Sequence, residues 1–174
     1  MPLKKHKEHP AEHQEKILDK KNKTAKDFLN SGLIIFNKKD YNWAINEFTQ
    51  SISLDSNLKD AFYYRGASYF FIENFKSAIN DLNTCIKMDS SYLSAYDILG
   101  NSYFRLKKYK ETIDVLTVYL KTQNRDEKAY FLRGLAKLYT FDYQGTIDDL
   151  SDAISINPNF EDYYLLDQRW DCPH

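Results

Sequence analysis

A 34-residue repeat is the feature of this sequence that most limits how the chain can fold. Four glycines lie 34 residues apart, and other residue types recur at fixed distances from them. An aromatic residue precedes each glycine by four positions and another follows it by nine; a small residue follows by twelve and a large apolar one by sixteen. A repeat of this length indicates one supersecondary unit used several times. The glycines are Gly32, Gly66, Gly100 and Gly134.

The spacing inside each unit predicts two α-helices that pack against each other. Apolar residues recur at steps of three and four, as at Ile45, Phe48 and Ile52, which is the period of an amphipathic helix. Small side chains let two helix backbones approach closely, so we expect the helices to cross at the glycine and at the small residue twelve positions later. Polar residues suited to N-caps precede three of the second helices, at Asp40, Asn74 and Asp142.

This pattern resembles the tetratricopeptide repeat, a helix–turn–helix unit of 34 residues. The resemblance covers residues 25–160 and implies an all-α fold, a right-handed α-solenoid of four repeats with a C-terminal capping helix. Thr24 and Asp27 have the spacing of a capping box at the start of the first repeat. The expected segments are a polar, basic and partly helical arm at 1–24, repeats at 25–58, 59–92, 93–126 and 127–160, and a capping helix and tail at 161–174.

Composition and charge narrow the classes of function. The chain has 24 Lys and Arg against 25 Asp and Glu, a net charge of −1, which gives no reason to expect a nucleic-acid partner. No apolar stretch approaches the roughly 18 residues of a membrane-spanning helix, so we expect no membrane insertion. The two cysteines, Cys85 and Cys172, show neither metal nor redox spacing, which favours a reducing, cytoplasmic setting.

The residue types needed for catalysis do not come together in the sequence. We find no nucleophile with a base, no glycine-rich phosphate loop and no metal cluster, so we predict no enzyme, no cofactor and no metal site. Cys85 occupies a core-facing position, and Asp148 with Asp149 is predicted to belong to a solvated face. Three histidines in the N-terminal arm are better explained as part of a polar arm than as ligands: His6, His9 and His13.

The resemblance also implies where a partner would bind. In tetratricopeptide repeats the first helices of successive units line a concave surface, so the predicted function is a scaffold that binds a peptide or amphipathic helix of another protein. The alternative is an integral subunit of a larger assembly, and the sequence does not indicate an oligomeric state. The implied groove is mostly apolar and aromatic, with a polar centre, and consists of Leu29, Leu33, Phe36, Tyr63, Ala67, Phe70, Asp97, Asn101, Phe104, Phe131, Leu135 and Leu138.

One specialised form of this groove is not expected here. Chaperone-binding members of the family hold a C-terminal carboxylate with a clamp of Lys, Asn and Arg side chains. Asp97 stands where a clamp lysine would lie and would repel a carboxylate. We therefore predict a groove without a carboxylate clamp. The remaining clamp positions are occupied by Leu29, Leu33, Tyr64, Ser94 and Ile98.

Overall fold

The computed structural model describes residues 23–159, and within that range every regular element is an α-helix. Much of the predicted N-terminal arm and the predicted capping helix, at 1–22 and 160–174, lie outside the described residues. Each predicted unit contains one pair of helices. The pairs are α2 (Ala25–Asn37) with α3 (Tyr41–Leu54), α4 (Lys59–Phe71) with α5 (Phe75–Met88), α6 (Leu93–Arg105) with α7 (Tyr109–Leu120), and α8 (Glu127–Tyr139) with α9 (Tyr143–Ile156).

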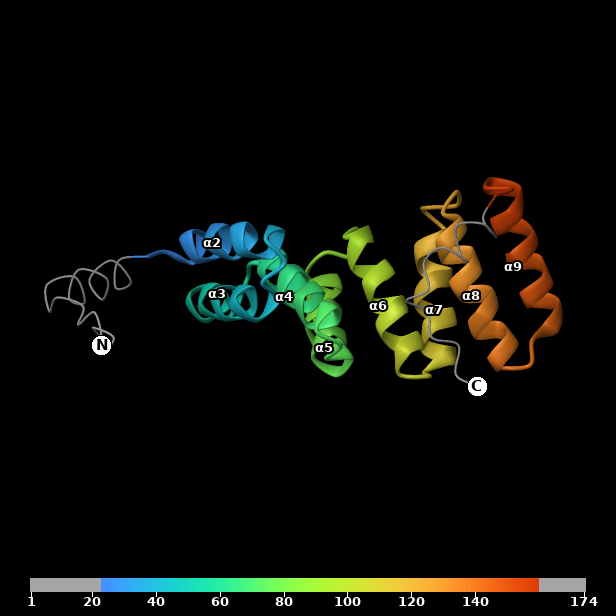
Figure 1. Cartoon of the computed structure of the whole chain (residues 1–174), viewed down its shortest axis with the longest axis horizontal. Helices are drawn as coiled ribbons and strands as arrows, with labels where there is room; N and C mark the ends of the chain where they lie inside the picture. Colours follow the sequence, from blue (N-terminus) through green and yellow to red (C-terminus); the bar gives the residue numbers. More distant parts are fainter. Residues whose placement is uncertain (1–22, 160–174) are drawn as a thin grey trace, which may run out of the picture.

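The helix pairs follow one another along the long axis of the molecule (Figure 1). Each helix packs on its partner within the repeat, and each second helix also packs on the first helix of the next repeat. The first helices α2, α4, α6 and α8 also contact their successors, and no two second helices contact each other as closely. The first helices therefore lie on the inner side of the curved array. This arrangement confirms the predicted all-α solenoid.

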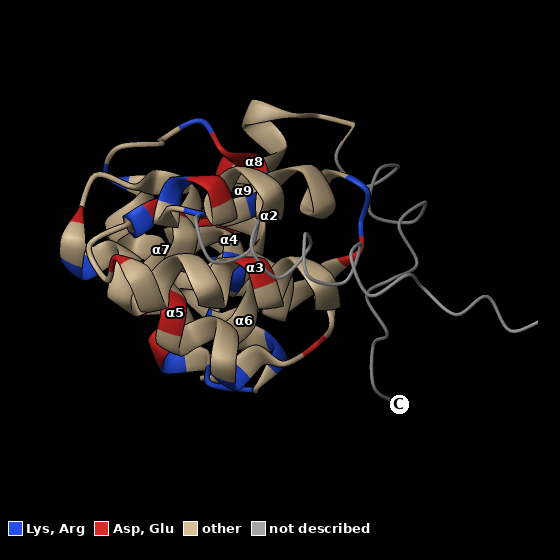
Figure 2. Ribbon diagram, turned by 90° about the vertical axis from the view of Figure 1, so that its left-hand side faces the viewer, with Lys and Arg blue, Asp and Glu red and all other residues tan. Residues whose placement is uncertain are grey.

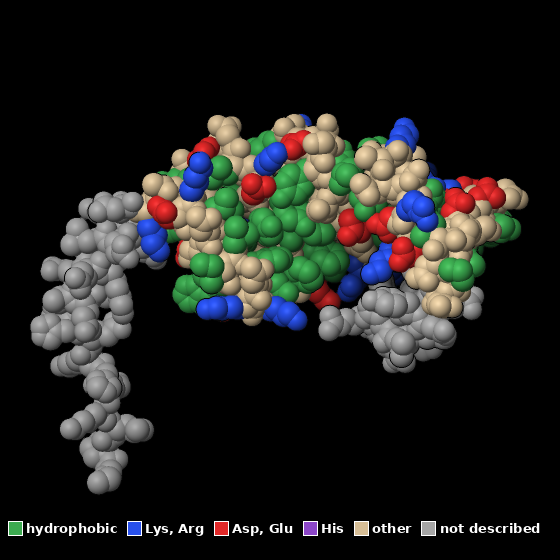
Figure 3. Space-filling model, turned by 90° about the horizontal axis from the view of Figure 1, so that it is seen from above, with side chains coloured by type: hydrophobic (Ala, Val, Ile, Leu, Met, Phe, Trp, Pro, Cys, Tyr) green, Lys and Arg blue, Asp and Glu red, His purple; other side chains and the backbone are tan. Residues whose placement is uncertain are grey.

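Charged and apolar side chains are distributed differently over this array. Acidic and basic residues are mixed along the ribbon when the molecule is viewed towards its N-terminal end (Figure 2). Hydrophobic side chains instead gather in one broad patch near the middle of the array, with charged side chains at its margins (Figure 3). Neighbouring repeats bury apolar side chains between them. The parts of these side chains that remain at the surface make the patch apolar.

The glycines lie where the two helices of a repeat cross, as the sequence predicts. A β-carbon added at Gly32 would lie 2.5 Å from the ring of Phe48, and one at Gly100 would lie 2.7 Å from the side chain of Leu116. Phe48 and Leu116 are the large residues sixteen positions after their glycines, and both are fully buried. The crossing is therefore close enough that the large side chain occupies the volume of the missing methyl group.

The small residue twelve positions after each glycine completes this crossing. Ala44 and Ala78 are completely buried in the first two repeats. Thr112 and Thr146 replace alanine in the last two, and their hydroxyls donate to the carbonyl oxygens of Gly100 and Gly134 at 3.4 and 3.3 Å. Each hydroxyl also donates within its own helix, at 3.1 Å from Thr112 and 2.8 Å from Thr146. Threonine is tolerated here because its hydroxyl is satisfied across the crossing.

The turn inside each repeat has the same geometry four times. In the first repeat the amide of Lys39 donates to the carbonyl of Phe36 at 2.8 Å, and that of Asp40 donates to Ile35 at 3.3 Å. This is a Schellman motif, and the residue it places in the left-handed region is Lys39, with φ of 63°. Glycine is the usual residue at this left-handed position, yet none of the four turns has one. A left-handed residue was therefore not predicted here from the sequence. The equivalent residues are Glu73, Lys107 and Phe141.

Each second helix starts directly after this turn, and the three predicted N-caps are confirmed, while α7 starts after Lys108 without a side-chain cap. The side chain of Asp40 accepts from the amide of Trp43 at 3.3 Å, and that of Asp142 accepts from Gly145 at 3.0 Å. Asn74 caps α5 in the same way. At the start of α2 the predicted capping box is also confirmed, since Thr24 and Asp27 each bond the other's backbone amide.

Flat side chains join neighbouring repeats near these turns. The ring of Phe71 stacks on Tyr41 of the preceding repeat with 4.7 Å between centroids, and Tyr139 stacks on Tyr109 at 4.5 Å. Between the second and third repeats the equivalent contact is made by Arg105, whose guanidinium lies 4.9 Å from the ring centroid of Phe75. A stacked ring or a cation over a ring serves the same purpose here, because both cover an aromatic face.

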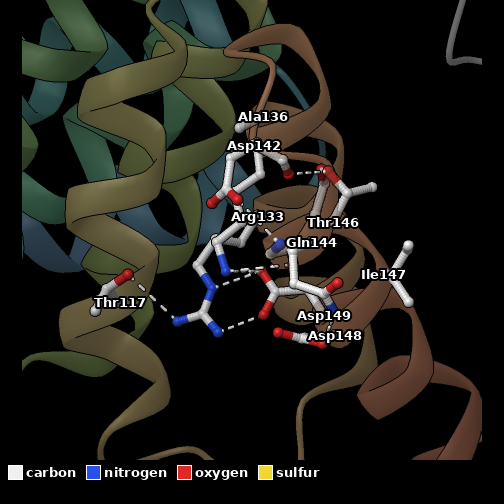
Figure 4. A network of polar contacts seen from close by, with 12 residues as sticks. Thr117, Arg133, Ala136, Asp142, Gln144, Thr146, Ile147, Asp148 and Asp149 are labelled. Atoms are coloured by element: carbon white, nitrogen blue, oxygen red, sulfur yellow. Dashed lines mark hydrogen bonds and ion pairs between the residues drawn. The ribbon is translucent and has the colours of Figure 1, made fainter.

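Buried ion pairs occupy the crossing in the second and fourth repeats. Arg133 donates two hydrogen bonds to Asp149, at 2.8 and 2.6 Å, and a third to Thr117 of the preceding repeat at 3.3 Å (Figure 4). Asp149 is 2% exposed, so the prediction that it belongs to a solvated face was wrong. The periodicity of α9 turns this carboxylate towards α8, where Arg133 compensates its charge, while its neighbour Asp148 is exposed.

The same network recurs 68 residues earlier. Arg65 donates to Asp81 twice at 2.7 Å and to Thr49 at 3.2 Å. In the third repeat the two charged positions are occupied by Leu99 and Val115, which pack together in the core. In the first repeat the arginine position is Ser31, and the acidic position is Glu47, whose Oε2 is buried with no hydrogen-bond partner among the described residues.

Gly100→Ala is expected to lower the free energy of unfolding by about 1 kcal/mol. Overpacking against Leu116 costs about 1–3 kcal/mol, and the gain in helix propensity returns about 0.5–1 kcal/mol. Gly134→Ala is the matched control, because its added β-carbon would come no closer than 3.2 Å to Asp149. Urea unfolding followed by circular dichroism compares the two. Equal destabilisation by both variants would contradict the close-crossing explanation.

Asp81→Val is expected to destabilise the protein by about 3–5 kcal/mol, because it leaves the buried charge of Arg65 uncompensated. The double variant Arg65→Leu/Asp81→Val reproduces the apolar pair of the third repeat and should recover to within about 1 kcal/mol of the wild type. A double-mutant cycle measured by urea unfolding tests both statements. Additive losses in the double variant would show that the two side chains stabilise the fold independently.

Candidate protein-binding groove

The predicted groove residues come from the inner helices α2, α4, α6 and α8 and fall into rows that run along the array. Most of their side chains are half-buried, so they contribute both to packing and to the surface. Three differ: Ala67 is 1% exposed and lies beneath the surface, whereas Leu138 is 42% exposed and Asp97 is exposed as well. The curvature of the array brings residues 34 positions apart into neighbouring places. A continuous surface results that no single repeat could provide.

One row is formed by aromatic rings that hold the helices of each repeat together. Phe36 meets Tyr41 edge to face with 5.4 Å between ring centroids, and Phe70 meets Phe75 at 5.7 Å. Phe104 meets Tyr109 in the same way at 5.5 Å. Since these contacts fix the rings, we assign them first to packing. A partner segment would meet ring edges rather than whole faces in this row.

The row at the centre of the inner face mixes apolar and polar side chains. It consists of Leu29, Tyr63, Asp97 and Phe131, one from each repeat. The ring of Tyr63 is held by Tyr64 of its own helix at 4.9 Å and by Tyr92 of the next repeat at 4.8 Å. These contacts fix Tyr63 on the inner face beside the N-terminal part of α6.

Asp97 lies in the middle of this row and accepts a hydrogen bond from an amide. The Nδ2 of Asn101, one turn later, donates to the Oδ1 of Asp97 at 3.1 Å and to its backbone carbonyl at 3.0 Å. The side chain of Asp97 is exposed to solvent. Nearby protein atoms nevertheless raise the pKa of Asp97 by desolvation, and the charge of Asp126 raises it further; Lys128 and the bond from Asn101 act in the opposite direction.

Two other carboxylates near this row accept hydrogen bonds from tyrosine hydroxyls. Tyr92 donates to Asp60 at 3.0 Å, and Tyr119 donates to Asp126 at 2.7 Å. The pKa of each tyrosine is raised, first by burial and then by the carboxylate that accepts its hydrogen bond. Asp126 also caps α8 through two backbone amides, at 3.1 and 3.0 Å. Sequence reasoning did not place Asp126 in this region, although its position just before α8 is that of an N-cap.

The described residues hold no cluster of three or more His, Cys, Asp and Glu that could bind a metal ion. The three histidines of the arm lie outside these residues, so the expectation that they bind no metal stays a prediction. Cys85 is completely buried, as predicted. Burial, followed by the charges of Asp60 and Asp89, raises the pKa of its thiol to about 12, with Lys59 opposing. A thiol held protonated in this way is a poor nucleophile.

Comparison with known proteins identifies the architecture. The sequence model of a family described as anaphase-promoting complex, cyclosome, subunit 3 matches residues 37–119, from the end of α2 into α7. A crystal structure of MamA superposes with a TM-score of 0.77 at 21% identity, covering 86% of this chain and 87% of MamA. The first tetratricopeptide repeat domain of Spaghetti (RPAP3), bound to the HSP90 peptide SRMEEVD, gives 0.63 at 23% identity, covering 66% and 91%. The chain has the fold of a tetratricopeptide repeat array.

Other comparisons agree with this assignment. MamA residues 41 to the end from Desulfovibrio magneticus RS-1 superpose with a TM-score of 0.74 at 19% identity, covering 78% of this chain and 76% of that chain. Among curated proteins, no relative matches the sequence. At these identities the solved structures establish the fold. The tetratricopeptide-type fold predicted from the glycine register is thereby confirmed.

Across residues 23–159, no helix combines the length and the apolar character that crossing a bilayer requires.

In a Cys172→Ser background, Cys85 is expected to resist modification by Ellman's reagent in the folded protein. At mildly alkaline pH fewer than about one thiol in a thousand is ionised when the pKa is about 12, and burial blocks the reagent as well. Addition of a denaturing concentration of guanidinium should release one reactive thiol per chain. Rapid modification of the native protein, followed by absorbance, would show that Cys85 is accessible.

Proposed function

We propose that this protein binds a segment of another protein along its inner face, as a peptide or an amphipathic helix lying across α2, α4, α6 and α8. The observation that supports this most directly is the presence of Leu29 and Tyr63 beside the polar centre of the inner face, with side chains that are half-buried. Apolar side chains left partly in water on a concave surface gain free energy when a second surface covers them.

The size of the surface suggests a moderate affinity. Covering ~500 Å² of apolar surface corresponds to ~12 kcal/mol of gross burial free energy. Loss of overall motion and ordering of the partner segment consume most of that gain. A dissociation constant on the order of micromolar follows. Such an affinity suits a partner that is exchanged rather than permanently held.

The groove is proposed to work without a carboxylate clamp. In the first repeat, the clamp positions carry the half-buried side chains of Leu29 and Leu33, which offer no hydrogen-bond donors. In the third repeat, Asp97 would meet an incoming carboxylate with a charge of the same sign. The HSP90 peptide in the related Spaghetti (RPAP3) structure ends in Glu-Glu-Val-Asp, which is the kind of ligand that this surface would repel.

Binding is favoured here over catalysis or nucleic-acid recognition. The buried thiol of Cys85 and the ion-paired carboxylate of Asp149 are both committed to the core. The mixed charges along the array supply no continuous basic surface in the view of Figure 2. We therefore keep the predictions of a non-enzymatic protein without a nucleic-acid partner.

One observation favours the alternative function, an integral subunit of a larger assembly. Phe141 is 76% exposed and Tyr143 60% exposed, with Ile147 and Ile154 also exposed on α9. The residues equivalent to Tyr143 in the first three repeats are covered by the next repeat, through Phe71, Arg105 and Tyr139. Sedimentation of the isolated full chain separates the two functions, because a soluble monomer with an intact groove would contradict an obligate subunit.

The double variant Tyr63→Ala/Phe131→Ala is expected to lose at least tenfold in affinity for peptides selected on the wild type from a phage-displayed random library. Central aromatic side chains usually carry much of an interface's binding energy. Val118→Ala serves as the control, since Val118 is exposed on α7, outside the inner face. Titration of synthetic peptides measures the loss, and thermal unfolding checks that each variant is folded. Unchanged binding by the double variant would place the site elsewhere.

The peptide SRMEEVD is expected to show no saturable binding up to about 1 mM, a free energy weaker than about −4 kcal/mol. The reason is the missing clamp together with the carboxylate of Asp97. Isothermal titration calorimetry with the full chain measures this directly. Tight binding that disappeared in Asn101→Ala would show that the groove does act as a clamp.

A further inference from the structure

An apolar stripe on α9 remains uncovered at the C-terminal end of the described array. This α9 stripe consists of Tyr143, Ile147 and Ile154, with exposed fractions of 60%, 58% and 48%. One repeat earlier the equivalent side chains are better covered, since Leu120, 34 positions before Ile154, is 5% exposed and Tyr109 is half-buried. The difference arises because α8 packs on α7, whereas among the described helices α9 packs closely on α8 alone.

The interface between α7 and α8 shows what covers such a stripe inside the array. The buried side of α8 includes Ala129, Leu132 and Ala136, whose steps of three and four place them on one side of the helix. Ala129 and Leu132 share a core cluster with residues of α7. Tyr139, at the end of α8, stacks on Tyr109, at the start of α7, so the two helices run antiparallel. The covering helix is 13 residues long and antiparallel to the helix that it covers.

The chain leaves α9 with the geometry that leads to a covering helix elsewhere in the array. The C-caps Asp55, Asp89 and Asn157 have nearly the same extended backbone, with φ of −145°, −147° and −135° and ψ of 103°, 98° and 95°. In each case the amide two residues later donates to the side chain of the cap, at 2.9, 2.9 and 3.2 Å. After Asp55 and Asp89 the chain enters α4 and α6, which pack on α3 and α5. The same exit favours a covering helix immediately after Asn159.

The sequence that follows has the residue types of such a helix. Tyr163, Leu166 and Trp170 stand 34 positions after the three buried residues of α8, at the same steps of three and four. Gln168 stands 34 positions after Gly134, where a second helix crosses. A glutamine side chain leaves no room for such a crossing and is suited to water. The segment is therefore amphipathic, with its apolar side in the register that faces α9.

We propose that residues 161–173 form a helix that lies over the α9 stripe, with the apolar side that contains Trp170 against it. Two large rings in place of two alanines hold this helix farther from α9 than α8 lies from α7, and they cover more area. The antiparallel register places Trp170 nearest Tyr143 and Ile147, at the start of α9. Because the segment follows α9 directly in the chain, docking avoids most of the loss of motion that a separate partner would incur.

A second copy of the chain is a poorer occupant of this surface. At the positions that are buried in α8, α2 carries Asp27, Asn30 and Ile34. Asp27 already accepts from the backbone amide and the hydroxyl of Thr24, and its charge would be desolvated against an apolar stripe. Docking of residues 161–173 accounts for the exposed end of α9 without a permanent partner, and it does not depend on the inner face.

Trp170 can report whether the segment is docked. The chain has two tryptophans, and Trp43 is 62% exposed on α3, so Trp43→Phe leaves Trp170 as the single indole without a change in the core. In this full-length background, quenching of Trp170 by acrylamide should be at least about threefold weaker under native conditions than in urea, because the ring is removed from water. The quenching should not vary with protein concentration, since the contact lies within one chain.

An acidic substitution on α9 tests where Trp170 docks. Ile147→Asp places a charge in the α9 stripe and should release the segment, which raises the quenching of Trp170 at least about twofold. Val118→Asp is the matched control, because Val118 is 49% exposed on α7 and lies outside the stripe. It should leave the quenching unchanged. Circular dichroism verifies that both variants are folded.

Hydrogen exchange of the unmodified chain requires no substitution. The amides of residues 165–172 should exchange at least about tenfold more slowly than those of an unfolded peptide with the same sequence. Exchange at the unfolded rate would overturn the inference, whatever the fluorescence of the variants.

Three results from the fluorescence would also overturn it. Equal quenching of Trp170 under native conditions and in urea would leave the α9 stripe open to another protein. Quenching that weakens with protein concentration, together with dimerisation in sedimentation, would assign the stripe to a second copy. Native shielding of Trp170 that Ile147→Asp leaves unchanged would place the segment elsewhere on the molecule.

Discussion

The close crossing of two helices at a glycine is the constraint on which the rest of this structure depends. In the first three repeats a large side chain of the second helix reaches into the place where a β-carbon would stand on the first, as Phe48 does at Gly32 and Leu116 at Gly100, and at Gly134 the contact is looser. Because the helices approach so closely, the turn between them must be short. A Schellman motif with a left-handed residue provides that turn in every repeat, even where the residue is Lys39 or Phe141. Close packing therefore takes precedence over the local preference for glycine.

At this crossing, the four repeats fill the same two positions with different pairs of side chains. The second and fourth use a buried arginine with an aspartate, the third uses Leu99 with Val115, and the first leaves Glu47 with a buried oxygen that lacks a partner. The ion pairs do more than fill space, since Arg65 and Arg133 also bond a threonine of the preceding repeat. They thus tie neighbouring repeats in an array whose stability depends on contacts between neighbours.

The inner face gains its character from the same stacking. Side chains such as Tyr63 and Phe131 belong to different repeats and come into one row because each first helix lies beside the next. That row places Asp97 near Asp126 and desolvates it, so a property relevant to recognition arises from packing between repeats. The aromatic contacts of Phe36, Phe70 and Phe104 show the limit of this reasoning, because those rings are held by packing within their own repeats, and Phe36 and Phe104 also contact rings of the next repeat. The groove residues therefore belong partly to the packed core and partly to the surface.

The sequence by itself determined the number of repeats, the helix pairs, the N-caps and the residues that meet at each crossing, because all of these depend on spacings of fewer than 34 residues. Gly100 with Leu116, Asp40 as a cap and Cys85 in the core could all be read from periodicity. Only the tertiary structure decided that Asp149 is buried, because its environment depends on Arg133 across the crossing and not on its exposed neighbour Asp148. The structure also decided that the pKa of Asp97 is raised, because that depends on the protein atoms that desolvate it and on the charge of Asp126. Local periodicity fixes which side of a helix a residue occupies, but its electrostatic environment comes from side chains distant in sequence.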